Sequence, residues 1–151
     1  MHSLNTNLGR LASFAPTILR VVLGVLFVYH GIDKFDTGMS NVEGFFDSQG
    51  VPLPGFTAPL TAVLEIVAGI ALIVGAYTRV AATVLAAVIV GALIFVKLDG
   101  DFLGGSELDF TYLAGLVALM LLGPGRLSVD EAMKLDDTVI DLRGAREVVR
   151  A

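Results

Sequence analysis

The chain has no cysteine among its 151 residues, which excludes disulfides, thiolate zinc sites, iron–sulfur clusters and thiol nucleophiles. Charged residues are scarce as well, at 17% against about 25% in an ordinary soluble domain. A formal net charge of −5 argues against nucleic acid as a partner, because binding to phosphate depends on clustered Lys and Arg. Hydrophobic residues make up 55% of the chain and the mean hydropathy is +0.80, which rules out a disordered chain. This composition indicates that the protein lies in a lipid bilayer.

Four apolar stretches approach the length of about 20 residues that a helix needs to cross a bilayer. In chain order they cover residues 14–31, 56–76, 80–96 and 108–122. Arg20 is the charged residue within the first stretch and Glu65 the one within the second, whereas the third has no charge. The fourth is shorter and ends at the Gly-Pro-Gly of residues 123–125. We therefore predict an all-α fold, a bundle of four transmembrane helices in which lipid is the immediate partner.

Short helices are predicted before the first span and after the fourth. Before the first span, apolar residues recur at helical spacing: Leu4, Leu8, Leu11 and Phe14. They predict an interfacial N-terminal helix that lies along the membrane. After the fourth span, Ser128 and Glu131 have the spacing of a capping box and predict the start of a short cytoplasmic helix. The polar tail that follows fits either a docked helix or a loose end.

Lys and Arg are divided unequally between the two sides of this bundle. One side carries Arg10, Arg79, Arg126, Lys134, Arg143, Arg146 and Arg150. The other carries Lys34 and Lys97 among many acidic residues. Because cytoplasmic flanks are rich in Lys and Arg, we predict a multi-pass protein of the cell membrane with both termini cytoplasmic and an acidic outer face. Within the first outer loop, residues 41–48 predict a short helix that lays Phe45 and Phe46 on the membrane surface.

Arg20 and Glu65 need an explanation because charges inside spanning helices are costly and normally have a partner. Their backbones should differ in depth by about 8 Å, within reach of two long side chains. Each shares its helix face with small residues, among them Gly24 and Gly31 on the first span and Ala62, Ala68 and Gly69 on the second. Small residues let helices approach closely. We therefore predict that the first two spans pack through these faces and that Arg20 and Glu65 form a buried pair.

Such a pair has two interpretations. It could fix the register of the helices and do nothing else, or Glu65 with Arg20 or His30 could form a polar site for protons or for a quinone carbonyl. The residues kept for that second hypothesis are His30, Lys34 and Glu65. His30 is one of two histidines in the chain and the only one outside the terminal tail. It therefore cannot form a two-histidine metal or haem site without a partner chain, and no metal is predicted. An interfacial histidine hydrogen-bonded to a neighbouring helix is the alternative.

Lys34 and Lys97 are predicted to extend towards the outer interface, where acidic residues could pair with them. Lys97, Glu107 and Asp109 form a predicted polar cluster on the outer face. The chain shows no nucleophile with an adjacent base and no phosphate-binding loop, so no catalytic residue is assigned and enzymatic activity is left open.

Several segments together resemble the DoxX family of small four-helix membrane proteins. They are R-V-V-L-G-x-L-F-x-x-H-G-x-x-K at 20–34, G-V-P-L-P at 50–54, L-E-I-V-A-G-I-A-L-I-V-G-A-Y-T-R at 64–79, Glu107, and G-P-G-R-L-S-V-D at 123–130. The resemblance implies a DoxX-like four-helix membrane domain over residues 1–135, followed by a polar cytoplasmic tail at 136–151. Members of the family often have histidine where this chain has Lys97, so a site that needs imidazole there is in doubt.

The family implies association with quinone-linked oxidation. The predicted function is therefore an integral membrane accessory subunit of a respiratory or quinone-linked redox complex, non-catalytic by itself and docked to other membrane subunits. The first alternative is a quinone-binding oxidoreductase component that uses the buried Arg, Glu and His residues, and the second is a small membrane carrier. No covalent cofactor is predicted, whereas a quinone or a lipid could occupy the bundle. Related proteins that pass electrons between thiols and quinone use cysteine pairs, and this chain cannot do so alone.

Overall fold

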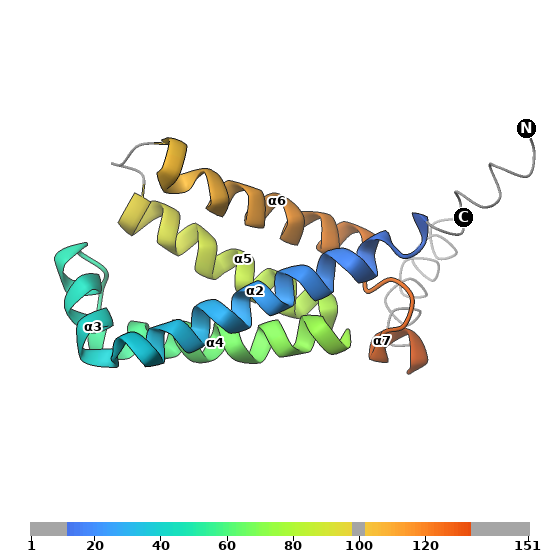
Figure 1. Ribbon diagram of the computed structural model, residues 1–151, viewed down its shortest axis with the longest axis horizontal. Helices are drawn as coiled ribbons and strands as arrows, with labels where there is room; N and C mark the ends of the chain where they lie inside the picture. Colours follow the sequence, from blue (N-terminus) through green and yellow to red (C-terminus); the bar gives the residue numbers. More distant parts are fainter. Residues whose placement is uncertain (1–11, 98–101, 134–151) are drawn as a thin grey trace, which may run out of the picture.

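A computed structural model describes residues 12–97 and 102–133, and every regular element in these two ranges is helical (Figure 1). The α-helices are α2 Ala15–Thr37, α3 Met39–Ser48, α4 Pro54–Val74, α5 Thr78–Ala92, α6 Glu107–Leu122 and α7 Val129–Ala132. Two π-helical turns, η1 Leu93–Lys97 and η2 Phe102–Ser106, lie between α5 and α6. The predicted interfacial N-terminal helix and the tail at 136–151 fall outside the described residues, apart from the last residues of that helix.

Three helices in the described ranges are long and apolar enough to cross a membrane: Ala15–Thr37, Pro54–Val74 and Thr78–Lys97. The third combines α5 with η1. The fourth predicted span forms α6, which has 16 residues and is shorter than the about 20 that a spanning helix normally needs. The all-helical fold is thereby confirmed, together with three candidate spans.

The long helices run side by side between two ends (Figure 1). At the α7 end, α2 begins, α4 turns into α5, and α6 ends. At the α3 end, α2 and α5 end and α4 and α6 begin. Gly75 and Tyr77 both adopt left-handed backbone conformations in the α4–α5 turn, with φ of 72° and 50°. The turn is therefore tight, and it brings the two apolar helices directly alongside each other.

Helices α2 and α4 pack through the small residues that the sequence indicated. A Cβ added to Gly24 would lie 2.6 Å from the backbone oxygen of Gly69, and one added to Gly31 would lie 2.7 Å from that of Ala62. At both crossings the backbones touch without intervening side chains. The core on the other side of this pair joins α5 and α6, and its fully buried members include Phe27, Leu72, Leu85, Leu116 and Leu119.

Helix α3 extends sideways from the end of the bundle at which α2 ends (Figure 1). Gly38, with φ of 91°, separates it from α2, and the turn at 49–53 leads back into α4. The predicted helix at 41–48 is confirmed within α3. Phe45 is exposed and Phe46 is half-buried, and both residues line a cavity of the protein. Their position on the membrane surface stays a prediction.

Candidate functional site: a lipophilic pocket and the buried charges

Arg20 is buried, with 1% of its surface exposed, and its guanidinium binds backbone carbonyls. Nη1 donates to the carbonyls of Leu72 and Ile73 at 2.9 and 2.5 Å, Nε to Pro124 at 3.0 Å, and Nη2 to Leu127 at 2.6 Å. Carbonyls of the last helical turn have no partner within their own helix. Arg20 thus satisfies the end of α4 and ties it to the loop that follows α6.

The predicted pair between Arg20 and Glu65 is therefore wrong, because Glu65 binds Lys34 instead. The two glycine contacts show the physical reason. Gly31 lies against Ala62 and Ile66, so the part of α2 beside Glu65 is 11 residues from Arg20, about 16 Å along the helix. The expected depth difference of about 8 Å between the two residues rests on the predicted ends of the spans. It does not include the stagger of the two packed helices.

Asp130 is the second buried charged group at the α7 end, after Arg20. Its Oδ1 accepts from the backbone N–H of Tyr77 at 2.6 Å and its Oδ2 from that of Thr78 at 2.8 Å, so this carboxylate caps the first turn of α5. Ser128 Oγ accepts from the N–H of Glu131 at 3.0 Å, which confirms the predicted start of a short helix at this position. The G-P-G-R-L-S-V-D segment therefore closes the α7 end of the bundle.

Asp130→Ala should lower the free energy of unfolding by about 1–2 kcal/mol, because two N–H groups at the start of α5 lose their acceptor. Resistance to SDS in mixed micelles, followed by far-UV circular dichroism, measures this loss. Asp130→Asn, which keeps one acceptor oxygen, should recover part of it. If Asp130→Ala unfolds at the same SDS fraction as the native chain, the carboxylate does not hold the helix start.

Glu65 and Lys34 form an ion pair near the α3 end. Lys34 Nζ lies 2.5 Å from Glu65 Oε2, and the Glu65 side chain is almost fully buried. Lys34 Nζ also lies 3.4 Å from the backbone oxygen of His30. The pair joins α2 to α4 one helical turn beyond the Gly31 contact, so close packing of the two backbones brings the long lysine within reach of the carboxylate.

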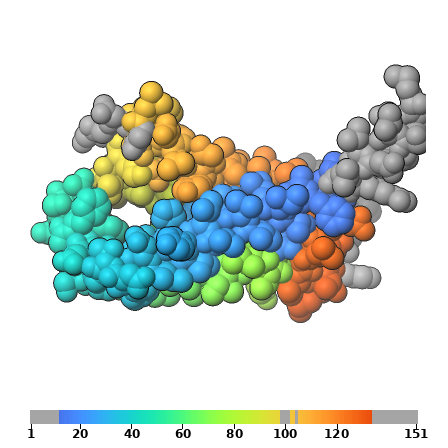
Figure 2. All heavy atoms as spheres, viewed as in Figure 1, coloured from blue at the N-terminus to red at the C-terminus, as the bar shows by residue number. Residues whose placement is uncertain are grey.

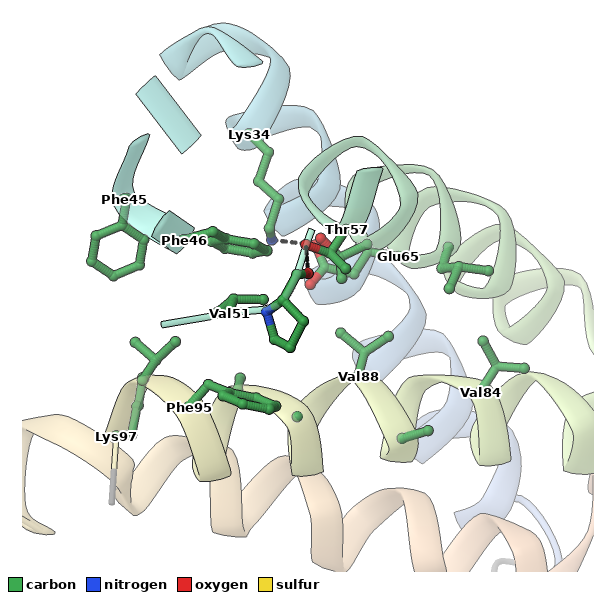
Figure 3. Close-up of a pocket in the computed structure, with 17 residues that line it drawn as sticks. Lys34, Phe45, Phe46, Val51, Thr57, Glu65, Val84, Val88, Phe95 and Lys97 are labelled. Atoms are coloured by element: carbon green, nitrogen blue, oxygen red, sulfur yellow. Dashed lines mark hydrogen bonds and ion pairs between the residues drawn. The ribbon is translucent and has the colours of Figure 1, made fainter. Parts of the chain in front are cut away.

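This ion pair lies on the wall of a pocket of about 600 Å³ between α3, α4 and α5 (Figure 3). Figure 2 shows the molecule hollowed between α3 and α5. The lining is mostly apolar and includes Phe46, Val88 and Phe95. Because α4 and α5 are apolar all round, the spacing of their residues could not show that part of each helix faces a cavity rather than lipid.

His30 does not join the ion pair through its ring. The imidazole is exposed and packs edge-on against Tyr112 of α6, with ring centroids 6.0 Å apart. Of the three residues in the predicted quinone or proton site, the structure thus brings Lys34 and Glu65 together and turns the His30 side chain towards another helix. The alternative expected a histidine hydrogen-bonded to a neighbouring helix; the structure shows a neighbouring helix in contact with His30, but through the ring of Tyr112.

Lys97 and Asp109 form a second ion pair at the α3 end, with 2.6 Å between Nζ and Oδ2. Lys97 Nζ also donates to the backbone carbonyl of Gly105 at 3.1 Å. Within the described residues, Glu107 contributes a backbone carbonyl, which accepts from Thr111 Oγ1 at 2.9 Å, and its carboxylate is not part of this pair. Two of the three residues of the predicted outer-face cluster are therefore in direct contact.

Comparison with known proteins settles the family. The DoxX family model matches residues 15–98. The chain belongs to the DoxX family. It is 37% identical over 113 residues to the Bacillus subtilis protein named "Putative oxidoreductase CatD", an alignment covering 75% of this chain and 82% of that relative.

Two further relatives place this DoxX protein among membrane proteins. It is 35% identical over 138 residues to an uncharacterized membrane protein of Mycobacterium tuberculosis, Rv3486, with 83% of this chain and 85% of that one covered. It is 28% identical over 138 residues to the Escherichia coli inner membrane protein YqjF, with 82% and 95% covered. No solved structure matches the chain. With three apolar helices long enough to span a bilayer, it is a membrane protein.

Proposed function

We propose that this DoxX protein is an integral membrane component of a quinone-linked redox assembly and that it holds the quinone in the pocket between α3, α4 and α5. The observation that carries the proposal is a mostly apolar cavity of about 600 Å³ with the Lys34–Glu65 ion pair on its wall. Small-molecule sites have volumes of about 300–1,000 Å³ and combine apolar walls with a few polar groups that orient the ligand.

The ion pair offers what a quinone headgroup needs in both redox forms. The ammonium of Lys34 has three N–H donors, and a quinone carbonyl can accept from it. Glu65 Oε2 accepts a hydrogen bond from Lys34 Nζ, so Oε1 can accept from a hydroquinone hydroxyl. The apolar part of the cavity suits the ring and the tail. Without cysteine the chain has no thiols to oxidise, so other subunits would supply the electron carriers.

The name of the Bacillus subtilis relative supports a redox context, and its alignment with this chain covers most of both proteins. We extend the proposal to topology: α6 is the fourth span, both termini are cytoplasmic, and the acidic α3 end faces outward. The chain has no native cysteine, so a single cysteine at Gly44 or at Arg126 should report the side of the membrane. Labelling of Gly44→Cys, but not Arg126→Cys, by an impermeant maleimide on intact cells supports this orientation, and the reverse result contradicts it.

Gly91→Leu should reduce quinone binding at least about tenfold, because the new side chain would fill the cavity that the ligand needs. Gly91 lines the pocket, and a Cβ added there meets no atom within 4 Å, so the helix can accept the leucine. Binding of a short-chain 1,4-quinone to the purified protein in nanodiscs is measured by equilibrium dialysis, and chromatography quantifies the bound quinone. A tenfold loss corresponds to about 1.4 kcal/mol.

Gly55→Leu is the matched control. This glycine also lies in a helix with open space around its Cβ, and it is not among the residues that line the pocket. It should bind quinone as the native protein does. Equal binding by the native protein and both variants would remove the pocket from the proposal. A native protein that binds no quinone but copurifies stoichiometrically with redox subunits would favour a purely structural accessory role.

A further inference from the structure

Lys97 lines the same pocket as the Lys34–Glu65 pair but comes from a different part of the bundle. Lys34 and Glu65 belong to α2 and α4, which are in backbone contact. Lys97 ends η1, the continuation of α5, and its partner Asp109 is in the first turn of α6. In Figure 3 the first ion pair lies on one side of the cavity, and α5 with Lys97 lies on the other.

The π-helical turn explains how Lys97 reaches this face. The other lining residues of α5 and η1 follow an α-helical stripe: Val84, Ala87, Val88, Gly91, Ala92, Phe95 and Val96. Lys97 is one position beyond the stripe. A π-helical turn contains one extra residue and so rotates the residues at its end relative to an α-helix. Such turns are rare in proteins overall, but those that occur are often found at functional sites. The local geometry of η1 thus places Lys97 on an otherwise apolar wall, with its ammonium held by Asp109 and Gly105.

Both lysines are neutralised by carboxylates at 2.5 and 2.6 Å, so the polar groups of the pocket carry no net charge. A phosphate would have to displace one of the carboxylates or add a negative charge beside it. A neutral hydrogen-bond acceptor, in contrast, can use the remaining N–H groups while both ion pairs stay formed. The Lys97 side chain is 34% exposed, which leaves it accessible to such a ligand.

We propose that Lys97 is a second headgroup contact, so that the bound molecule is a neutral ring with a carbonyl at each of two opposite positions, a 1,4-quinone, bridging the α2–α4 pair and the α5–α6 pair. This inference rests on the proposed function and deepens it. The carbonyl of one side accepts from Lys34, and the carbonyl of the other side accepts from Lys97. Binding then holds together two helix pairs that diverge around the cavity.

The test uses full-length protein in nanodiscs and two probes, a 1,4-naphthoquinone with one short prenyl chain and the matching 1-tetralone, which has lost one carbonyl. Single lysine variants would leave a buried carboxylate unpaired and could unfold, so each pair is removed whole: Lys97→Met with Asp109→Asn, and Lys34→Met with Glu65→Gln. Each double variant should bind the naphthoquinone about tenfold more weakly, as expected for the loss of a hydrogen bond from a charged donor. Circular dichroism and size exclusion confirm folding.

The tetralone distinguishes two contacts from one. It should bind the native protein about tenfold more weakly than the quinone, and each double variant should lower its affinity by less than it lowers that of the quinone. If only the Lys34 and Glu65 variant loses affinity, the quinone site stands and the second contact is wrong. If the native protein binds neither probe, the proposed function fails as well. Retention of an anionic phospholipid that the quinone cannot displace would overturn the neutral headgroup.

Discussion

Arg20→Met is expected to cause the largest loss of stability of any single substitution considered for this protein, about 3–5 kcal/mol, the range for disrupting a buried charged network. The side chain donates to four carbonyls, from Leu72, Ile73, Pro124 and Leu127, and methionine would leave these carbonyls without that donor. The expected result is a protein that unfolds at a much lower SDS fraction and elutes as aggregate in mild detergent.

Arg20→Lys separates charge from geometry. Lysine keeps the positive charge but concentrates its three donors on one atom, whereas the planar guanidinium distributes five donors over a fork. It cannot reach both the end of α4 and the loop after α6, so we expect only partial recovery. Arg126→Met is the matched control, because this exposed arginine at the same end stacks over the Phe14 ring with 5.1 Å to the centroid. Its loss should cost about 1 kcal/mol or less.

An Arg20→Met protein as stable as the native one would contradict the role given to these hydrogen bonds. A loss of quinone binding without a loss of stability would also contradict it, because Arg20 does not line the pocket. The same two measurements therefore separate the α7 end, where the buried charges support the fold, from the α3 end, where they face a cavity.

Gly24→Ala should destabilise the protein by about 2–3 kcal/mol, although alanine is the better helix former by about 1 kcal/mol. The added methyl would lie 2.6 Å from the Gly69 carbonyl oxygen and 2.8 Å from Ile73 Cγ1. The first of these atoms belongs to the backbone, so α2 and α4 have to separate. That movement would loosen the contacts beside it, including the crossing at Gly31. SDS unfolding measures the loss.

Gly44→Ala provides the control with the opposite sign. This glycine lies in α3, and a Cβ added to it meets no atom within 4 Å, so alanine should leave stability unchanged or raise it slightly. Gly24→Ala combined with Gly69→Ala should cost less than the sum of the two single changes, because both widen the same crossing. A stabilising effect of Gly24→Ala would show that the two backbones are not in contact at this point.

The packing of α2 on α4 could be predicted because small residues recur on one face of each helix, and the structure brings Gly24 to Gly69 and Gly31 to Ala62. The short helix after Ser128 could be predicted because its cap depends on residues three positions apart. Both signals are local, either within one helix or within one turn. The partners of Arg20 could not be predicted, because backbone carbonyls carry no sequence signature and all four lie 52 to 107 residues away along the chain.

The sequence by itself determined that this protein lies in a membrane and is all-helical, because long apolar stretches with few charges form helices that span a bilayer. It also identified Arg20 and Glu65 as charged residues that need partners, and Lys34, Lys97 and Asp109 as polar groups of the outer end. Only the tertiary structure decided which of them meet. The stagger of two packed helices moves a side chain by 1.5 Å for each residue, and this places Glu65 beside Lys34 instead of Arg20. The pocket has the same origin, since the cavity exists only where α3, α4 and α5 come together.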